Sequence, residues 1–344
     1  MFVEGQGKHL APLIWMRRFM GQYIVRRLLQ SIIVIFGVTL LSFLTLHLAG
    51  DPTYFYVSER ASEEEINETR IKLGFDKPLP VQYLNFLGNL ARGDLGMSIR
   101  SRKPAIELVM ERLPATLELT FFAMLISIVV AIPIGIIAAT RRGTAADGGI
   151  MLMAMFGQSM PSFWLGIMLI IFVGLQLKWL PISGHVAVIQ PFMDGNIAEG
   201  FGNIPDAIRF LIMPGVTIGL FSLSRNARLV RSSMLEVLSQ DYVVTARSKG
   251  LRERVIIMRH AFRNALIPIV TMLGLEFGFL LSGVVVTETV FSWPGVGRLV
   301  TNAITQRDIP VVQASVVVFA VLFIIINLLV DIIYAQLDPR IRLR

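Results

Sequence analysis

The chain has 344 residues, of which 54% are hydrophobic and 16% are charged, and its formal net charge is +8. So little charge in a chain of this length excludes an ordinary soluble globular protein and indicates a membrane protein. There is no cysteine, which excludes a disulfide framework, a thiolate metal site and a cysteine nucleophile. The positive charge is compatible with nucleic-acid binding, but the cytoplasmic loops of a multi-pass protein produce the same excess.

Uncharged apolar runs predict six transmembrane helices in an all-α polytopic fold. At roughly 1.5 Å per residue, a helix of about 20 residues crosses a hydrocarbon core of about 30 Å. The fourth run is short, and we expect the polar residues after it to extend its helix. The predicted spans are 28–49, 119–140, 148–177, 210–224, 265–287 and 309–330.

The charges of the loops predict the orientation of these spans. Residues 225–263 contain nine basic and three acidic residues, whereas residues 50–115 contain nine basic and ten acidic residues. The N-terminal segment and the C-terminal tail are also mainly basic. The positive-inside rule therefore places both termini and residues 225–263 in the cytoplasm. The first run is long for a secretory signal, and no A-x-A site follows it, so we interpret it as an uncleaved anchor.

Five segments follow from this assignment. They are a cytoplasmic N-terminal segment (1–27), the first transmembrane helix (28–49), an extracytoplasmic helical segment (50–115), a five-helix core with a cytoplasmic loop at 232–268 (116–334), and a cytoplasmic tail (335–344).

The extracytoplasmic segment contains its own helix signals. Ser62 followed by Glu65 is a capping box that opens a helix to about residue 72. Pro104 suits the first turn of a short helix that ends before Pro114. The segment is therefore predicted to be a small helical subdomain, and its apolar stripe at 83–90 is expected to pack on the membrane spans or lie in the interface.

The cytoplasmic stretch 241–268 contains the clearest break in the chain. Apolar residues recur at helical spacing from Met234 to Ala246 and again from Val255 to Leu266, with Gly250 between the two patterns. Glycine is the residue that most easily adopts the positive φ at which helices end. We therefore predict a short helix at 232–249, a sharp turn, and a second helix that leads back into the membrane.

The sequence offers no catalytic constellation. Its four histidines are far apart and none has metal-ligand spacing, and no phosphate-binding glycine loop is present; the histidines are His9, His47, His185 and His260. No catalytic or metal-binding residue is therefore assigned, and an intramembrane enzyme is disfavoured. Any nucleotide that drives transport is expected to be bound by a different polypeptide.

Glu276 is the one acidic residue deep within a predicted span. Intramembrane carboxylates usually face a cavity or a partner, and Gly274 and Gly278 around it form a GxxxG pattern that permits close helix packing. We interpret these three residues as lining a pore or packing helices together. The alternative is a proton-coupled secondary transporter or channel that uses Glu276, although no inverted repeat and no second intramembrane charge support it.

Several stretches together resemble the permease subunits of ATP-binding-cassette (ABC) importers, and in particular the dipeptide, oligopeptide and nickel branch of that family. The resemblance begins near residue 22 and is greatest to the first of the two permeases that such systems contain. It is carried by Arg26-Arg27-Leu28-Leu29, Gly50-Asp51-Pro52, Gly93-Asp94-Leu95-Gly96, Arg112-Leu113-Pro114-Ala115-Thr116, residues 241–251, 259–261 and 264–268, and residues 288–298.

The resemblance implies an ATPase-docking loop, with ATP and Mg bound by the partner subunits and no cofactor in this chain. The implied docking residues are Asp241, Tyr242, Ala246, Arg247, Lys249, Gly250 and Leu251, and the implied outer-loop motif is Trp293, Pro294, Gly295, Gly297 and Arg298. The loop departs from the general importer pattern, because Val244 stands where a glutamate begins it.

The implied partners are a second homologous permease, two ATP-binding subunits, an extracytoplasmic solute-binding protein and membrane lipid, without nucleic acid. The implied location is a bacterial or archaeal inner membrane. Peptides, nickel chelates, glutathione and sugars pass through relatives of this family, so the substrate stays open. A solvated basic loop with lipid contacts is the simplest other interpretation of 241–268.

Overall fold

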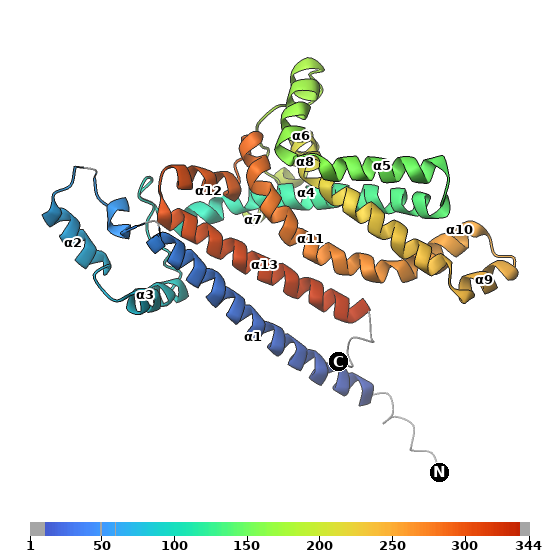
Figure 1. Ribbon diagram of the computed structural model, residues 1–344, viewed down its shortest axis with the longest axis horizontal. Coiled ribbons are helices and arrows are strands. Elements are labelled where there is room, and N and C mark those ends of the chain that lie inside the picture. The colour runs from blue at the N-terminus through green and yellow to red at the C-terminus, as the bar shows by residue number, and fades with distance from the viewer. Residues whose placement is uncertain (1–10, 49, 59, 338–344) are drawn as a thin grey trace, which may run out of the picture. The chain divides into compact units, whose positions relative to one another are not determined.

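Helices form all the regular secondary structure of the part of the chain that the structure describes. The computed structural model describes residues 11–48, 50–58 and 60–337 (Figure 1). Residues 1–10 of the predicted N-terminal segment 1–27, and residues 338–344 of the predicted tail 335–344, lie outside these residues. The chain divides into two compact units, one from Met1–Asn89 with Val316–Arg344 and one from Leu90–Ser315.

Among the described residues, three helices are long and apolar enough to cross a membrane. They are α4 (Ala105–Thr140), α8 (Ile197–Leu238) and α13 (Ile309–Leu337), the last over Ile309–Val330. A fourth span is present if the bent pair at 145–176 crosses as one. The all-helical membrane class is therefore confirmed, and the count of six spans stays a prediction.

The first unit contains α1 (Ala11–Leu48), a 3₁₀ turn (Pro52–Phe55), α2 (Glu63–Leu73) and α3 (Leu79–Ala91). The predicted capping box is present, since Ser62 accepts from the Glu65 amide and Glu65 accepts from the Ser62 amide. Tyr83 anchors α3 on α1: its hydroxyl lies 3.0 Å from Thr39 Oγ1 and 3.1 Å from the Phe36 carbonyl oxygen. The stripe on α3 therefore packs, through Tyr83, on the first apolar helix.

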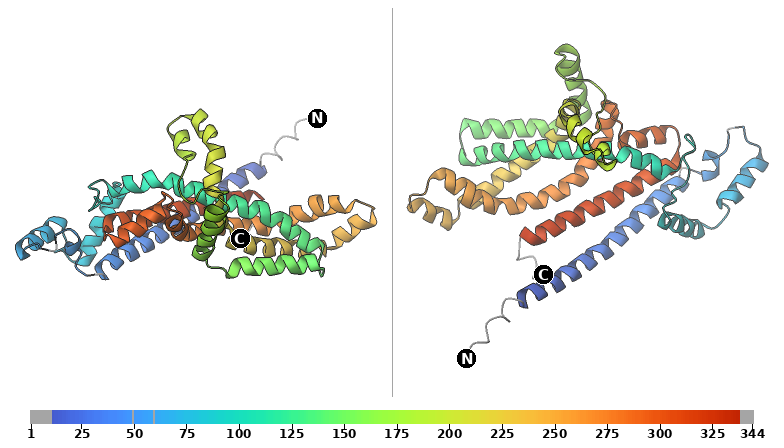
Figure 2. Two further views of the ribbon diagram at one scale, coloured as in Figure 1. Left: turned by 90° about the horizontal axis from the view of Figure 1, so that it is seen from above. Right: turned by 180° about the vertical axis from the view of Figure 1, so that it is seen from behind.

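The second unit is built around α4 and α8, which run side by side with α5 (Ala145–Ser159) (Figures 1 and 2). Its buried core includes Leu119, Ile218, Leu280 and Trp293, and a second cluster lies around Val230. The other helices of this unit are α6 (Ser162–Leu169), a π-helical segment (Ile170–Gln176), α7 (Ile189–Met193), α9 (Asp241–Ser248), α10 (Glu253–Val255), a π-helical turn (Ile256–Ala261), α11 (Phe262–Val290) and α12 (Val296–Thr305).

The predicted helix end before Pro114 is wrong, because α4 continues through it to Thr140. A proline inside a helix removes one hydrogen bond and costs about 3 kcal/mol. Val109, Ala115 and Leu119 are all buried on either side of Pro114, and burying a large apolar side chain contributes about 1.5 to 3 kcal/mol. Packing along the whole face of α4 therefore outweighs the local preference to stop.

The third predicted span is also not one straight helix. The chain bends by 100° between α5 and α6, at Met160, whose backbone is extended with φ −79° and ψ 128°. Pro161 follows it, and a residue before proline is disfavoured in the helical region. The uncharged run at 148–177 conceals this bend, because hydropathy does not register backbone geometry.

Candidate functional site

The stretch 241–261, named here the elbow, contains α9 and then α10 with the π-helical turn, at the end of the second unit where α8 stops (Figures 1 and 2). The predicted single helix at 232–249 is wrong, because α8 ends at Leu238 and α9 begins at Asp241. The Ser239 hydroxyl donates to the Glu236 carbonyl oxygen over 2.7 Å. Such a local side-chain bond competes with helix continuation.

Gly250 ends α9 as the glycine signal predicts. Its φ is +72°, and the amides of Gly250 and Leu251 donate to the carbonyl oxygens of Arg247 and Ala246 over 2.9 and 3.4 Å. These two bonds form a Schellman motif, which satisfies carbonyl groups left open at the end of a helix. The sharp turn is therefore a property of the local sequence.

A small core holds the elbow together. Val243, Ala246 and Ile256 are buried against one another, with Leu238 at the edge. Ala246 is therefore directed into the elbow, and its small side chain lets α9 approach the helical turn at Ile256. The residues of the elbow that remain accessible to a partner are the exposed ones around this small core.

Polar contacts join the elbow to the start of α11. Asn264 Nδ2 donates to the Tyr242 hydroxyl over 2.8 Å and to the His260 carbonyl oxygen over 3.0 Å. Arg247 and Glu253 form an ion pair of 2.7 Å across the turn, and hydrogen bonding from Arg247 lowers the pKa of Glu253. Since α10 and the π-helical turn lead into α11 without a loop, this part of the elbow and α11 form one continuous helical segment.

The exposed face of the elbow combines apolar and basic side chains. Tyr242, Val244, Leu251 and Met258 expose 41 to 54% of their surface. Exposed apolar side chains gathered in one short segment are a feature of interaction sites. Around them lie the exposed cations Lys249, Arg252, Arg254 and Arg259. This face suits a protein partner with an apolar groove and an acidic rim.

The outer-loop motif is fastened by a buried carboxylate, Glu288. Thr116 Oγ1 donates to Glu288 Oε1 over 2.7 Å, and the Arg298 amide donates to Oε2 over 3.0 Å. The Val296 amide donates to Thr116 Oγ1 over 2.8 Å, so Thr116 bridges the loop and the carboxylate. Glu288 is fully buried, and we name this arrangement the outer latch.

The structure explains why tryptophan and glycine occupy the remaining positions of this motif. Trp293 is buried, and its Nε1 donates to the Ala115 carbonyl oxygen over 2.8 Å. A Cβ atom at Gly295 would overlap the Glu288 carboxylate, and one at Gly297 would lie 2.6 Å from Val285 Cα. Pro294 is half-buried in the same turn. The motif is therefore a backbone cradle shaped around one acidic side chain.

The Arg298 side chain forms a further hydrogen bond at the partly exposed side of the outer latch. Its Nη1 donates to the Ser292 carbonyl oxygen over 2.7 Å, and Ser292 has a φ of +53°. The arginine thus braces the strained start of the turn, and the loop 291–298 is fixed at both ends.

A second buried carboxylate, Glu118, holds the neighbouring outer loop. It accepts from the amides of Val188 and Ile189 over 2.8 and 2.6 Å, and lies 2.6 Å from His185 Nε2. The His185 ring stands edge-on to Trp293, with 4.6 Å between the centroids. Two outer loops therefore meet on α4 beside the outer latch.

Glu276 joins three helices inside the second unit. Asn226 Nδ2 of α8 donates to Glu276 Oε2 of α11 over 2.5 Å and to Ser127 Oγ of α4 over 3.0 Å. Glu276 is fully buried, and Gly278 is half-buried on the same helix. The side-chain surroundings of position 274 lie outside the described residues. The cluster fits the helix-packing interpretation, and a pore-lining role for Glu276 stays a prediction.

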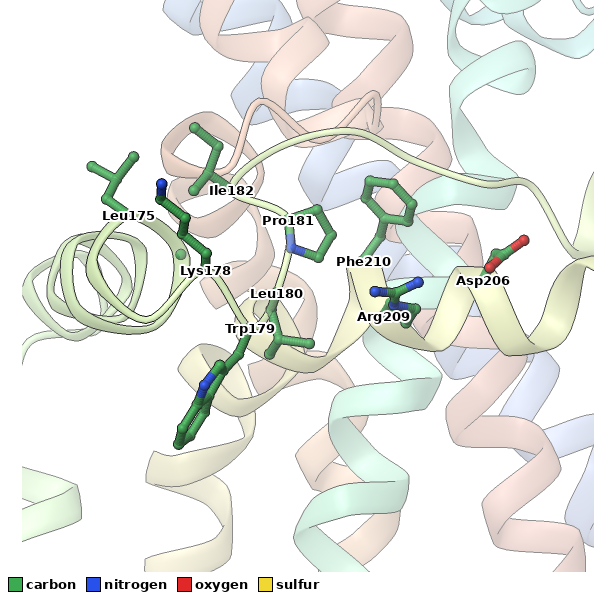
Figure 3. A pocket seen from close by; sticks show the side chains of 10 residues that line it. Leu175, Lys178, Trp179, Leu180, Pro181, Ile182, Asp206, Arg209 and Phe210 are labelled. Carbon is green, nitrogen blue, oxygen red and sulfur yellow. The ribbon is translucent and has the colours of Figure 1, made fainter.

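A cavity of about 440 Å³ lies on the predicted outer side of the second unit. Figure 3 shows the side chains that line it, from the end of the π-helical segment, from the residues that follow it and from α8. Lys178, Asp206 and Arg209 supply charge, and Trp179 beside them is 68% exposed. The cavity is suited to receive a protruding group of a partner on this side.

Comparison with known proteins decides the family. Residues 131–343 match the family described as "Binding-protein-dependent transport system inner membrane component", and residues 20–120 match its N-terminal companion family. The chain belongs to this family of importer permeases. It is 43% identical over 94% of its length to the dipeptide transport system permease protein DppB of Escherichia coli K12, of which 99% is covered.

Other permeases are similar to the chain. It is 44% identical over 94% of its length to the di/tripeptide transport system permease protein DppB of Pseudomonas aeruginosa UCBPP-PA14, of which 99% is covered. In fold it is similar to the inward-facing MetNI methionine ABC transporter, with a TM-score of 0.51 and 17% identity over 67% of this chain and 96% of that one. At this identity the likeness shows the fold alone.

Sequence reasoning missed the two buried carboxylates, Glu288 and Glu118, that hold the loops on the predicted outer side of this permease. Glu288 and Glu118 both stand at the edges of apolar runs, where an acidic residue is easily taken as a solvated helix end. A signal was present, because each lies close in sequence to a motif of the permease family. Their side-chain partners, Thr116 for Glu288 and His185 for Glu118, are nevertheless more than sixty residues away in the chain, so these contacts are not visible in the pattern.

Proposed function

We propose that the chain is a membrane subunit of an ATP-driven importer and forms half of the pathway for peptides delivered by a solute-binding protein. Family membership supports the importer role, and the peptide substrate rests on the dipeptide and di/tripeptide permeases that share 43 and 44% of its residues. A second homologous permease forms the other half. The chain itself catalyses nothing, and ATP and Mg are bound by two partner subunits.

In this proposal six helices cross a bacterial inner membrane and both termini are cytoplasmic. The basic excess at 225–263, with nine basic and three acidic residues, supports the orientation. The solute-binding protein then docks on the outer side, where the cavity beside Trp179 and the outer latch lie. Its contacts are expected in loops 51–115, 178–209 and 288–310.

The elbow is the proposed docking site of an ATPase subunit. The observation that carries this proposal is the set of exposed apolar side chains on the elbow, whose second part, α10 and the π-helical turn, continues into α11 without a loop. Movement of the ATPase is then transmitted along α11 as a rigid-body displacement. The other end of α11 carries Glu288, so the displacement reaches the outer latch.

Charge placed on the exposed face tests the docking site. Val244→Asp and Leu251→Asp each put a carboxylate where an apolar contact is proposed, and we expect loss of ATPase co-purification and of transport. The control is Thr144→Asp, which adds a carboxylate at an exposed position outside the elbow, where aspartate also suits the N-cap of α5. Normal co-purification of both elbow variants, with correct membrane insertion, would overturn the docking assignment.

The alternative is a proton-coupled secondary transporter or channel that acts through Glu276. It requires uptake into liposomes that contain no ATPase, abolished by Glu276→Gln. The family match favours the importer, and the hydrogen bond from Asn226 gives Glu276 a helix-packing role that needs no proton movement.

A further inference from the structure

A cavity of about 320 Å³ lies where α5 meets α6, and we name it the bend pocket. The 100° bend at Met160 opens one side of it, while α8 and α11 close the other. Gln158 and Ser162 line it from the bend, and Thr217 lines it from α8. The pocket thus joins polar groups to the apolar interior of the second unit.

Aromatic rings form the wall of the bend pocket opposite the bend. Phe221 of α8 and Phe279 of α11 stack with 5.0 Å between their centroids and 22° between their planes. Gly157 lets α5 pack closely on α8 at the pocket, because a Cβ there would overlap Ser224 Oγ. A flat wall of this kind accepts apolar groups of different shapes without selecting one of them.

Two arginines on α8 border the bend pocket. The guanidinium carbon of Arg225 lies 5.4 Å from the centroid of the Phe279 ring, and its Nε is buried without a hydrogen-bond partner among the described residues. Arg228 Nη2 donates to Gln158 Oε1, which itself lines the pocket. Both cations therefore touch the residues that form its walls.

The charges of Arg225 and Arg228 are not balanced within the described part of the chain. Neither forms an ion pair with a carboxylate there, whereas Arg231, on the next turn of α8, makes two hydrogen bonds of 2.7 and 2.8 Å with Asp147. A cation in or near a membrane span is costly unless it is paired, and such residues commonly mark the route of a substrate. An anion is the missing complement.

We propose that the bend pocket binds the C-terminal carboxylate of a peptide on its way through the permease. The inference rests on the proposed peptide substrate. Arg225 and Arg228 pair with the carboxylate, while the Phe221–Phe279 wall accommodates the last side chain. Every free peptide has a terminal carboxylate whatever its sequence, so this recognition fits a transporter of a whole class of peptides.

The experiment uses the complete transporter with its partner subunits in proteoliposomes. Because this chain contains no cysteine, Ser162→Cys introduces a single reporter thiol at the pocket, and the complex without it gives the background from partner cysteines. Labelling rates are compared for an anionic and a cationic methanethiosulfonate of similar size. If Ser162→Cys abolishes uptake, Leu165→Cys, also at the pocket, takes its place.

The arginines should favour the anionic reagent. A unit charge about 6 Å away, at an effective dielectric constant of about 40 to 80, changes a local ion concentration roughly three- to tenfold. Arg225→Gln and Arg228→Gln together should therefore lower the anionic-to-cationic rate ratio about tenfold or more. The control, Arg209→Gln, removes an exposed cation near the other end of α8 and should leave the ratio unchanged. An unchanged ratio in the double variant would overturn the proposal.

Ligand protection then identifies the occupant. During turnover, alanyl-alanine should slow labelling at least threefold, and its C-terminal amide, supplied at concentrations that equally saturate the binding protein, should not. Equal protection by both peptides contradicts carboxylate recognition. Protection by anionic lipid in the vesicles, with no effect of peptide, assigns the site to a lipid headgroup and likewise overturns the proposal.

Uptake of radiolabelled alanyl-alanine separates this inference from the proposed function. Uptake without protection of the reporter thiol rejects the bend pocket and leaves the peptide importer intact. Absence of uptake by the transporter that carries no introduced cysteine, under conditions where the binding protein binds the dipeptide, rejects the peptide importer itself.

Discussion

Glu288 is a fully buried carboxylate near the end of α11. Its carboxylate receives the Thr116 hydroxyl and the Arg298 amide, and the glycines at 295 and 297 leave room for it. One side chain thereby connects the end of α11, the start of α4 and the turn before α12.

Removal of this carboxylate should loosen the outer loop. Glu288→Ala leaves the Thr116 hydroxyl and the Arg298 amide without an acceptor, at a cost of about 1 to 3 kcal/mol for each buried group. We expect a clear fall in the melting temperature of the detergent-solubilised protein, measured by tryptophan fluorescence, which Trp293 reports directly. Glu64→Ala, an exposed change on α2, should leave that temperature unchanged; an equal melting temperature for Glu288→Ala would refute the outer latch.

The Arg247–Glu253 ion pair predicts a pH dependence of the elbow. Hydrogen bonding from Arg247 lowers the pKa of Glu253 from its ordinary value of 4.5, so the stabilisation is complete above pH 4.5 and is lost as the pH falls further. Hydrogen exchange, corrected for intrinsic rates, should show weaker protection of the Gly250 turn below pH 4.5. In Glu253→Gln that protection should already be reduced at neutral pH and should no longer vary in this range.

Single residues were predictable from the sequence where their signal is local. Gly250 and the Ser62–Glu65 capping box depend on neighbours within a few positions, and both appear as expected. The partners of Glu288 and Glu276 come from helices far along the chain. Only tertiary packing brings them together, so no pattern in the sequence announces them.

Among the elements, the elbow and α11 act as one piece. Tyr242 and Asn264 join them by a hydrogen bond, and the helical turn at 256–261 leads into α11 without a break. The Schellman turn at Gly250 fixes the angle between α9 and the helical segment that leads into α11. The orientation of the docking face therefore depends on one backbone conformation.

That dependence can be tested against a matched backbone change. Gly250→Ala forces a side chain into a left-handed conformation with φ +72°, at a cost of about 1 to 2 kcal/mol. Gly143→Ala imposes the same strain, with φ +78°, in the loop between α4 and α5. We expect weakened ATPase binding, measured by fluorescence titration, for Gly250→Ala alone; equal affinities for the two variants would show that the turn does not orient the docking face.

Element boundaries show where sequence patterns reach their limit. The hydropathy run at 148–177 predicts one helix, while Pro161 bends the chain by 100°. Pro114 predicts a helix end, while buried packing carries α4 past it. At Pro161 the local effect of proline on the backbone ends the helix although the mean hydropathy of the run predicts that it continues. At Pro114 tertiary packing of the buried residues keeps the helix intact although the local effect of proline predicts an end. The composition of these segments does not decide between the two results.

At the scale of the whole molecule, the features of the second unit follow one helix from end to end. The elbow precedes α11, Glu276 and the bend-pocket ring Phe279 lie along it, and Glu288 stands near its far end. A displacement that begins at a docked ATPase can thus pass the proposed substrate pocket before it reaches the outer latch. This order of sites along α11 is the one expected of an importer subunit, which must couple the ATPase to the substrate pathway and to the predicted outer side.

The most direct test of this account is energised uptake by the reconstituted complex. The permease pair, the ATPases and the binding protein are incorporated in proteoliposomes, and uptake of a radiolabelled dipeptide is measured with and without ATP. The account predicts uptake that requires ATP and both ATPase subunits, and its loss in Val244→Asp but not in Thr144→Asp. Dipeptide uptake by the permeases alone, driven by a proton gradient and abolished by Glu276→Gln, would contradict it.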